Sequence, residues 1–380
     1  MSATGVNGRR GAAPWGLLGM LALVALGEWA FTRHEMDVLA PWHWDWRHTG
    51  KAARTQAPES EILCFGDSLV KFGVLPAVVE ARTGRRTYNL AVALGQTPSS
   101  YFLLRRALRA GSRPSALLVD ATPHLLRESP RAPQHLRQWP EMLGTAEMLD
   151  LAWTARDPDF LAAMAVAKLL PSLRARQEVR GAVLDALRGG PSRRRFLAAQ
   201  FWRNTRVNRG ANAMPGGPPN VDCAGACRTL YSHFGCDPVN AAYLDRFLAL
   251  ADARGIPVFW VITPLSTEMQ QLCERSGFDA AHTAFVEGLR RRFPNLTVLD
   301  GRRSRYGQSL HTDDPVHLNH LGASAFTADL APFLARFLTG GDTPRWVSLP
   351  PYHARPEPIP IEDVDESGLA LREQTPSARR

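Results

Sequence analysis

The chain has 380 residues, of which 45% are hydrophobic and 21% charged, which suits one sizeable domain with an insertion or two small domains. Its net charge of +9 comes almost entirely from arginine, because Lys51, Lys71 and Lys168 are the only lysines. No recognised nucleic-acid-binding motif accompanies this charge, so we expect no nucleic-acid partner. An anionic lipid or glycan suits the charge equally well.

An apolar segment lies near the N-terminus, over residues 12–31, with Glu28 as its one charged residue. Its length of about 20 residues is that of a membrane-spanning helix. Arg9 and Arg10 precede it, so we expect residues 1–11 in the cytoplasm and the rest of the chain on the other side of the membrane. A cleaved signal peptide is the alternative. No convincing small-residue cleavage site follows, which favours an uncleaved anchor.

Residues 32–60 are predicted to link this anchor to a folded domain. Tryptophans alternate within the segment, at positions 42, 44 and 46. Aromatic residues beside a membrane span often lie among the lipid headgroups. The same alternation also suits a strand that packs one face on a domain. The sequence leaves both interpretations open.

The domain begins near Glu61, where Ile62–Phe65 form an apolar run of the length of one buried strand. Gly66 permits a sharp exit from that strand, and Asp67 and Ser68 follow at the start of a predicted helix. Parallel sheets carry their active sites at the carboxyl edge, where such a serine would project its hydroxyl. The alternative is an ordinary turn whose serine caps the helix.

A second stretch, residues 313–322, precedes the last predicted helix. It spaces Asp314 and His317 as D-x-x-H, followed by Leu-Asn. Together with Gly-Asp-Ser-Leu at 66–69, it resembles the first and last blocks of the GDSL/SGNH hydrolase family. The resemblance implies that Ser68 is the nucleophile, His317 its base and Asp314 the carboxylate that orients the histidine. A serine hydroxyl needs such a base, because it is a weak nucleophile near neutral pH.

A second apolar strand is predicted at residues 87–92, and the turn 93–98 follows it. This stretch resembles the second block of the same family, in which a glycine N–H binds the oxyanion. The matching position is Gly95, so the resemblance implies an oxyanion hole made by the backbone N–H groups of Ser68 and Gly95. One such donor can contribute about 3 kcal/mol to transition-state stabilisation. The alternative is a plain turn glycine.

The third block of the family, Gly-x-Asn-Asp, is expected after a strand at 115–119. The chain has Ala121-Thr-Pro-His at this place instead. Pro123 therefore replaces the asparagine that supplies a third contact to the oxyanion in the family. Thr122 and His124 are the neighbouring side chains that would have to replace this missing contact to the oxyanion.

The alternation of strands and helices stops at residues 125–236, where helical patterns predict an insertion. The insertion is either a cap over the site or a peripheral addition. Strands at 258–262 and 296–299 resume the pattern, which predicts a parallel sheet with helices on both faces.

We therefore predict a three-layer α/β/α domain over residues 61–340. The resemblance implies a flavodoxin-like SGNH hydrolase fold with a parallel five-stranded sheet. Residues 341–380 are rich in Pro, Arg and Glu and show little apolar periodicity. They are predicted to form a disordered tail.

Three of the five cysteines, Cys223, Cys227 and Cys236, cluster in the insertion. Outside the cytoplasm, a disulfide among them is permitted. A zinc site with His233 is the alternative, although the spacing matches no strong zinc pattern. A metal site in the Asp/His-rich run 311–320 would leave the Gly-Asp-Ser motif unexplained. We predict no metal and no other cofactor.

These features predict a membrane-anchored acyl-ester hydrolase or O-acyltransferase that acts on an acylated glycan or lipid of the cell envelope. The two activities differ in whether water or a sugar hydroxyl attacks the acyl-enzyme. An anchor followed by such a domain also resembles envelope acyl-transfer proteins. The alternative is a catalytically weak SGNH-like module that binds glycan or protein, which the missing asparagine motivates.

Overall fold

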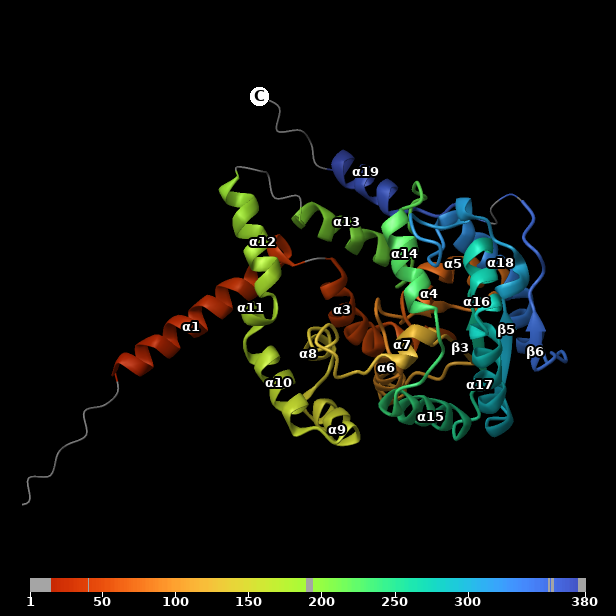
Figure 1. Ribbon diagram of the computed structural model, residues 1–380, viewed down its shortest axis with the longest axis horizontal. Helices are drawn as coiled ribbons and strands as arrows, with labels where there is room; N and C mark the ends of the chain where they lie inside the picture. Colours follow the sequence, from red (N-terminus) through yellow and green to blue (C-terminus); the bar gives the residue numbers. More distant parts are fainter. Residues whose placement is uncertain (1–14, 40, 189–193, 355, 357–358, 375–380) are drawn as a thin grey trace, which may run out of the picture.

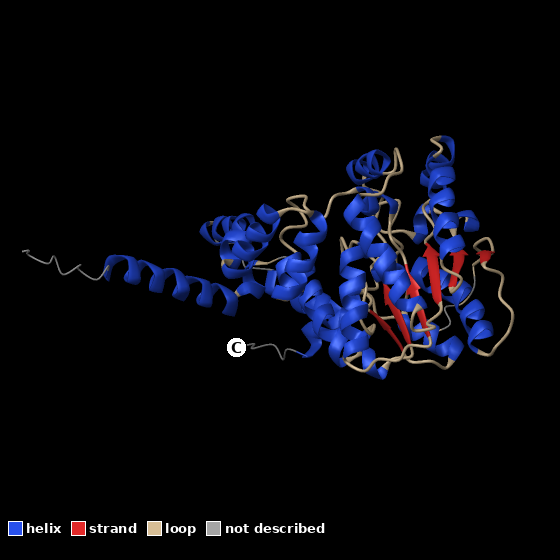
Figure 2. Ribbon diagram, turned by 90° about the horizontal axis from the view of Figure 1, so that it is seen from below, coloured by secondary structure: helices blue, strands red, loops and turns tan. Residues whose placement is uncertain are grey.

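The central element is a six-stranded sheet with the order β2-β1-β3-β4-β5-β6, in which every pair of neighbours is parallel (Figure 2). The computed structural model describes all residues except 1–14, 40, 189–193, 355, 357–358 and 375–380. The strands are β1 (Ile62–Phe65), β2 (Thr87–Asn89), β3 (Ala116–Val119), β4 (Val258–Ile262), β5 (Leu296–Asp300) and β6 (Trp346–Ser348). The predicted parallel sheet is confirmed, but the predicted number of five strands is wrong, because β6 pairs with β5.

The sheet is buried on both faces, as its apolar strands require. Successive residues of β1 point to opposite sides, so that Leu63 and Phe65 belong to one apolar core and Ile62 and Cys64 to the other. The first core contains side chains of α3 (Pro41–Thr55), α6 (Thr97–Arg109), α15 (Pro238–Asp252) and α17 (Phe278–Arg292). The second contains side chains of α4 (Ser68–Gly73), α5 (Pro76–Thr83) and α18 (His320–Leu338). Helices thus form a layer on each face of the sheet.

The N-terminal residues form three helices, α1 (Trp15–Arg33), α2 (Glu35–Val38) and α3, followed by the short 3-10 helix η1 (Ala57–Glu59). Helix α1 is long and apolar enough to cross a membrane, and none of its residues is buried. It projects away from the rest of the protein (Figure 1). The segment 32–60, which we expected to be a linker, instead contributes α3 to the first core, where Trp46 is buried.

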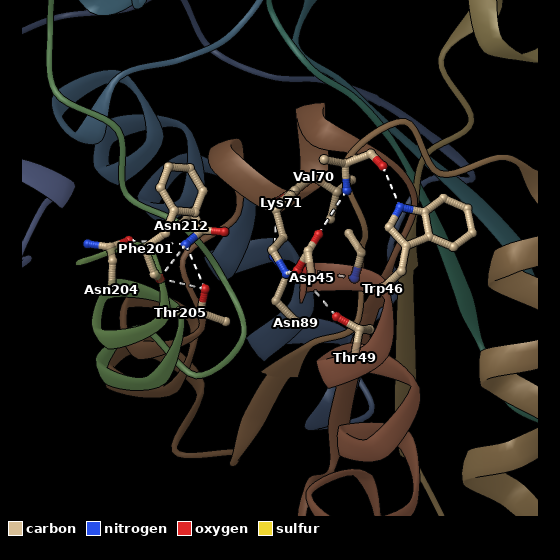
Figure 3. A network of polar contacts seen from close by, with 12 residues as sticks. Asp45, Trp46, Thr49, Val70, Lys71, Asn89, Phe201, Asn204, Thr205 and Asn212 are labelled. Carbon is tan, nitrogen blue, oxygen red and sulfur yellow. Dashed lines mark hydrogen bonds and ion pairs between the residues drawn. The ribbon is translucent and has the colours of Figure 1, made fainter. Parts of the chain in front are cut away.

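A buried polar network explains why α3 belongs to the domain (Figure 3). Asp45 forms an ion pair with Lys71 of α4, whose side chain is fully buried. The other carboxylate oxygen of Asp45 accepts a hydrogen bond from the Ala93 N–H at 3.0 Å, and the Trp46 indole donates to the Ala93 carbonyl at 2.9 Å. Helix α3 therefore binds both the N–H and the carbonyl group of Ala93, which lies in the turn after β2.

The segment 125–236 is helical, as predicted, and divides into two parts. It comprises α7 (Pro123–Arg127), α8 (Trp139–Met142), α9 (Thr145–Ala155), α10 (Pro158–Leu169), α11 (Pro171–Arg174), α12 (Arg176–Leu187), α13 (Arg194–Val207) and α14 (Val221–Leu230). Helices α9–α12 lie on the flank from which α1 projects (Figure 1). Helix α14 and the residue after it, Tyr231, pack with Leu69 and Val316, next to Ser68 and His317. This last part adjoins the predicted site, as does α7, which carries Pro123 and His124.

The C-terminal residues, which we expected to form a disordered tail, include β6 and α19 (Val364–Gln374). Val347 and Leu349 are buried in the second core, and α19 packs on α13. A strand of three residues is too short to show a period in the sequence, which explains why it was missed. The remaining elements are α16 (Thr267–Arg275), η2 (Arg302–Ser304) and η3 (Gln308–Leu310).

Candidate active site

Ser68 lies at the carboxyl end of β1, as the first residue of α4. The chain leaves the strand through Gly66, whose φ of +139° favours glycine, and whose missing Cβ would lie 2.9 Å from the Asp120 carbonyl oxygen. Asp67 caps the helix, because its carboxylate accepts a hydrogen bond from the Leu69 N–H at 2.9 Å. The same carboxylate accepts from the Thr122 N–H at 3.1 Å. These contacts fix the serine turn against the loop after β3.

The three residues of the predicted triad lie in hydrogen-bonding contact. The Ser68 Oγ lies 2.8 Å from the His317 Nε2, and the His317 Nδ1 lies 2.6 Å from an oxygen of Asp314. When Nδ1 carries the proton and donates a hydrogen bond to Asp314, Nε2 presents a lone pair to the serine hydroxyl. This is the arrangement in which a histidine can take the proton of a serine nucleophile.

Asp314 is held as a carboxylate by its surroundings. One oxygen contacts His317, and the other accepts hydrogen bonds from the Val316 and His317 N–H groups at 2.8 Å each. Burial alone would raise the pKa of Asp314, but these hydrogen bonds and the charge of His317 lower it to about 2. A carboxylate fixed in this way orients the imidazole and stabilises its protonated form.

The neighbouring Asp and His residues have other surroundings. Asp313 is exposed. His311 is buried and its Nδ1 lies 3.0 Å from the Gly307 carbonyl oxygen, whereas His320 lies 3.4 Å from Asp363. Within the described part of the chain, no group of three His, Cys, Asp or Glu side chains could hold a metal ion.

The cysteines of the insertion are not joined. All five thiols of the chain are free, so the structure does not contain the disulfide that we considered among Cys223, Cys227 and Cys236. Cys223 and Cys227 lie one turn apart on α14, and Cys227 packs in the apolar cluster beside the site. His233, the considered fourth zinc ligand, contacts Arg127 instead.

Gly95 lies against the serine turn, but its N–H is engaged. A Cβ at this position would lie 2.6 Å from the Gly66 carbonyl oxygen, so only glycine fits there. The Gly95 N–H donates a hydrogen bond to the Val92 carbonyl at 2.8 Å, and Leu94 between them has a φ of +59°. The turn therefore uses internally the N–H that the resemblance assigns to an oxyanion.

His124 is the residue after Pro123, the position at which the resemblance leads one to expect an asparagine. Its Nδ1 is buried and has no hydrogen-bond partner among the described residues, and its ring lies 5.5 Å from that of Tyr231. Burial lowers the pKa of His124 to about 4, against the opposing effect of the Asp67 charge. The ring is therefore neutral near pH 7 and retains one N–H donor. The sequence shows that His124 follows Pro123, but it does not predict that the Nδ1 of His124 is buried.

Asp120 is a second polar residue at this edge, and the sequence analysis did not single it out. It follows β3 directly, is buried, and accepts a hydrogen bond from the Thr122 hydroxyl at 3.3 Å. Burial and the charge of Asp67 raise the pKa of Asp120 well above its usual value. A polar residue directly after a buried parallel strand was the signal that could have identified it.

A small pocket opens beside the serine turn and is mostly apolar. Its lining includes Leu69 and Pro123 near the turn, with Tyr231, Leu265 and Phe278 farther along. Polar groups on its wall come from Asp120, Gln270, Asp279, His282 and Arg302. The pocket has a volume of about 30 Å³, and neither Ser68 nor His317 lines it, so it has room only for a very small group near the serine turn.

Comparison with protein-family models and with curated proteins gave no match from which a function could be transferred. No protein-family model matches the chain, and no curated protein matches it. The chemistry of the site must therefore be argued from its own geometry.

Proposed function

We propose that the protein is a membrane-anchored serine acyl-ester hydrolase or O-acyltransferase of the GDSL/SGNH type. The observation that carries this proposal is the contact of Ser68 with His317 at 2.8 Å and of His317 with Asp314 at 2.6 Å. Ser68 and His317 are 249 positions apart in the chain, whereas Asp314 and His317 are 3 positions apart. All three side chains meet at the carboxyl edge of the sheet. The strand order β2-β1-β3-β4-β5, with β6 added, also agrees with the flavodoxin-like order that the resemblance implies.

In the proposed reaction the Ser68 oxygen attacks the acyl carbonyl carbon while its proton moves to the His317 Nε2. Asp314 stabilises the imidazolium that forms. The tetrahedral intermediate then expels the alcohol, which takes the proton from His317, and the acyl group remains on Ser68. Water or a second hydroxyl attacks this acyl-enzyme, with His317 again as base. Transfer and hydrolysis share every residue up to this last step.

The oxyanion donors are proposed to be the N–H groups of Ser68 and Gly95 and the imidazole of His124. As the first residue of α4, Ser68 has no acceptor for its N–H within the helix. Gly95 must share or release its hydrogen bond to Val92 in order to act. His124 offers a neutral N–H in place of the asparagine of the family.

The substrate is proposed to be an acylated glycan or lipid of the cell envelope. The apolar helix α1 supports a membrane location, with residues 1–11 in the cytoplasm and the catalytic domain on the other side. The small pocket that begins at Leu69, the residue after Ser68, limits the acyl group that it can hold to a very short one. No cofactor enters any of these steps.

A fluorophosphonate probe tests the proposal, because it reacts with serines that an adjacent base activates. Full-length protein should be labelled at Ser68, and Ser68→Ala and His317→Ala should abolish the labelling. Ser266 also stands at the N-terminus of a helix, α16. The variant Ser266→Ala therefore serves as the control and should be labelled as strongly as the unmodified chain. Folded protein that takes no label would refute the nucleophile.

A catalytically weak module that binds glycan or another envelope protein is the second candidate. The engaged Gly95 N–H and the absent asparagine favour it, since both weaken the stabilisation of an oxyanion. For this candidate, Ser68 would take no probe, and Ser68→Ala would bind an acylated glycan as well as the unmodified chain does.

A further inference from the structure

Exposed apolar side chains are concentrated on the flank formed by α9–α12. Half of the large apolar side chains that the structure records as exposed outside α1 lie on these four helices. They are Leu149, Trp153, Val166, Leu169, Leu173, Val183, Leu184 and Leu187. Trp153 is 85% exposed and Leu187 79% exposed, which is unusual for residues of this size. A concentration of this kind marks a surface that binds something apolar.

Helix α10 shows that this exposure is organised. Phe160 and Met164, one turn apart, are buried and face the domain. Val166 and Leu169 lie on the exposed side, and Leu173 of α11, which follows the helix break at Leu170, is exposed as well. The helix is thus apolar on both sides, although only one side packs against the protein.

This flank is joined to the apolar N-terminal helix. Glu28 is the only acidic residue of α1, and its carboxylate accepts hydrogen bonds from both the N–H and the hydroxyl of Ser172 in α11, the former at 2.9 Å. The one charge that would be costly in the membrane is therefore satisfied by the neighbouring helix.

The position of this contact along α1 sets the depth of α11 in a bilayer. A helix of 19 residues is about 28 Å long, close to the thickness of the hydrocarbon core. Glu28 precedes Arg33, the last residue of α1, by five positions, which corresponds to about 8 Å along the axis. Helices that lie in the membrane interface bury their apolar faces at about 5–10 Å. Helix α11 therefore sits at the depth of an interfacial helix.

The charges on the flank complement anionic headgroups. Arg176, Arg180 and Arg188 are exposed and form no ion pair within the described part of the chain. The two acidic residues of α12 are already engaged, Glu178 with Arg137 and Asp185 with Arg194. The flank therefore combines exposed leucines with uncompensated arginines, which is the composition of an interfacial membrane surface.

We propose that α9–α12 form a membrane-docking flank, which lies in the headgroup region of the leaflet that α1 leaves, with its leucines among the upper acyl chains and its arginines on anionic phospholipid. This inference rests on the anchor in the proposed function but not on its chemistry. Helices α10–α12 run across the C-terminal end of α1 (Figure 1), so that the protein contacts the bilayer through a surface as well as a span.

Photocrosslinking of full-length protein in vesicles of phosphatidylglycerol and phosphatidylethanolamine tests the proposal. Benzoylphenylalanine is placed at Leu169, at Leu187 or, as control, at Leu321, which is 44% exposed on α18. Mass spectrometry should find lipid adducts at Leu169 and Leu187 in several-fold excess over Leu321. In Arg176→Gln/Arg180→Gln, the share of adducts with phosphatidylglycerol should fall, whereas Arg254→Gln on a distant turn should leave it unchanged.

Three results would overturn the docking flank. Adduct yields at Leu169 and Leu187 no higher than at Leu321 would show that these residues face water. Crosslinks to a second copy of the chain would show that the flank is a protein interface. Release of the full chain by carbonate would remove the anchor itself. Fluorophosphonate labelling of the same samples separates these results from a failure of the proposed chemistry.

Discussion

Two adjacent carboxylates precede His317, and their surroundings give them different expected roles. Both oxygens of Asp314 are engaged, with the imidazole on one side and two backbone N–H groups on the other. Asp313 is exposed, and the hydrogen bonds to the imidazole and to these two N–H groups all come from Asp314. Only Asp314 can fix the tautomer in which Nε2 accepts the serine proton.

Asp314→Asn should therefore reduce turnover of a small acyl ester strongly, because an amide favours the wrong histidine tautomer. In a known triad the equivalent change costs about 10⁴-fold in turnover. Asp313→Asn is the matched control and should change turnover little. The measurement is steady-state kinetics of both variants, with folding checked by circular dichroism. A larger loss in Asp313→Asn would show that the orienting carboxylate is assigned wrongly.

His124 is expected to act on the transition state and not on substrate binding. Loss of one oxyanion donor costs about 10²–10³-fold in turnover, so His124→Ala should lower kcat by that order and leave KM nearly unchanged. His124→Gln keeps an N–H donor and should restore part of the rate. Unchanged kcat in His124→Ala would exclude the residue from the oxyanion hole.

At the scale of elements, α3 is the support of the turn that carries Gly95. Asp45 and Trp46 hold the Ala93 N–H and carbonyl, two residues before the glycine. Asp45 also compensates the buried Lys71, which lies one turn after Ser68 in α4. One helix from the segment expected to be a linker thus contacts both halves of the candidate site.

A chain that starts at residue 50 should consequently be much less stable than one that starts at residue 34. The shorter chain leaves Lys71 buried without its carboxylate, and removing one partner of a buried ion pair costs about 3–5 kcal/mol. Both chains lack α1, so that the comparison isolates α2 and the start of α3. Urea unfolding followed by circular dichroism gives the difference. Equal midpoints for the two chains would refute the supporting role of α3.

The sequence predicted the elements whose signal is local. Strands β1, β3, β4 and β5 contain the apolar residues that a buried parallel strand requires, and the motif spacing identified Ser68, Asp314 and His317. The predicted strand 87–92 is shorter in the structure, because β2 ends at Asn89 and its apolar residues 90–92 follow the strand. Helix α3 was missed because its alternating tryptophans suggested a strand or a headgroup contact. Asp45 in this helix pairs with Lys71, a partner distant in sequence that no local pattern identifies. The hydrogen bond of the Gly95 N–H depends on the positive φ of Leu94. A leucine in the sequence does not predict a positive φ.

For the whole molecule, two buried histidines predict a loss of stability in acid. Burial lowers the pKa of His124 to about 4, and burial and the charge of Arg302 lower that of His282 to about 3, from an ordinary value of 6.5. Below pH 6.5 the unfolded chain binds protons at these positions and the folded chain does not. These two histidines therefore lower the free energy of unfolding as the pH falls from 6.5 towards 4, by about 3 kcal/mol each, whereas the raised pKa of Asp120 acts in the opposite sense.

Urea unfolding at pH 7 and pH 4.5 measures this dependence. His282→Gln removes one titrating group and should reduce the difference between the two pH values. His353→Gln, at an exposed position, is the control and should leave the difference unchanged. Asp314 contributes little between these two pH values, because its pKa of 3.8 in the unfolded chain and of about 2 in the folded chain both lie below pH 4.5. A pH difference of equal size in His282→Gln would contradict the assignment.

The folded connection between α1 and the domain limits how far Ser68, the proposed nucleophile, can travel. A flexible linker of the length of residues 32–60 would give a root-mean-square reach of about 30 Å. Here that segment is mostly helical, and Arg47 of α3 binds both Glu35 of α2 and Glu141 of α8. With α1 in a bilayer, the serine stays at a constant height above the lipid. Its effective concentration is then high for acyl groups presented at that height and close to zero for those deeper in the envelope.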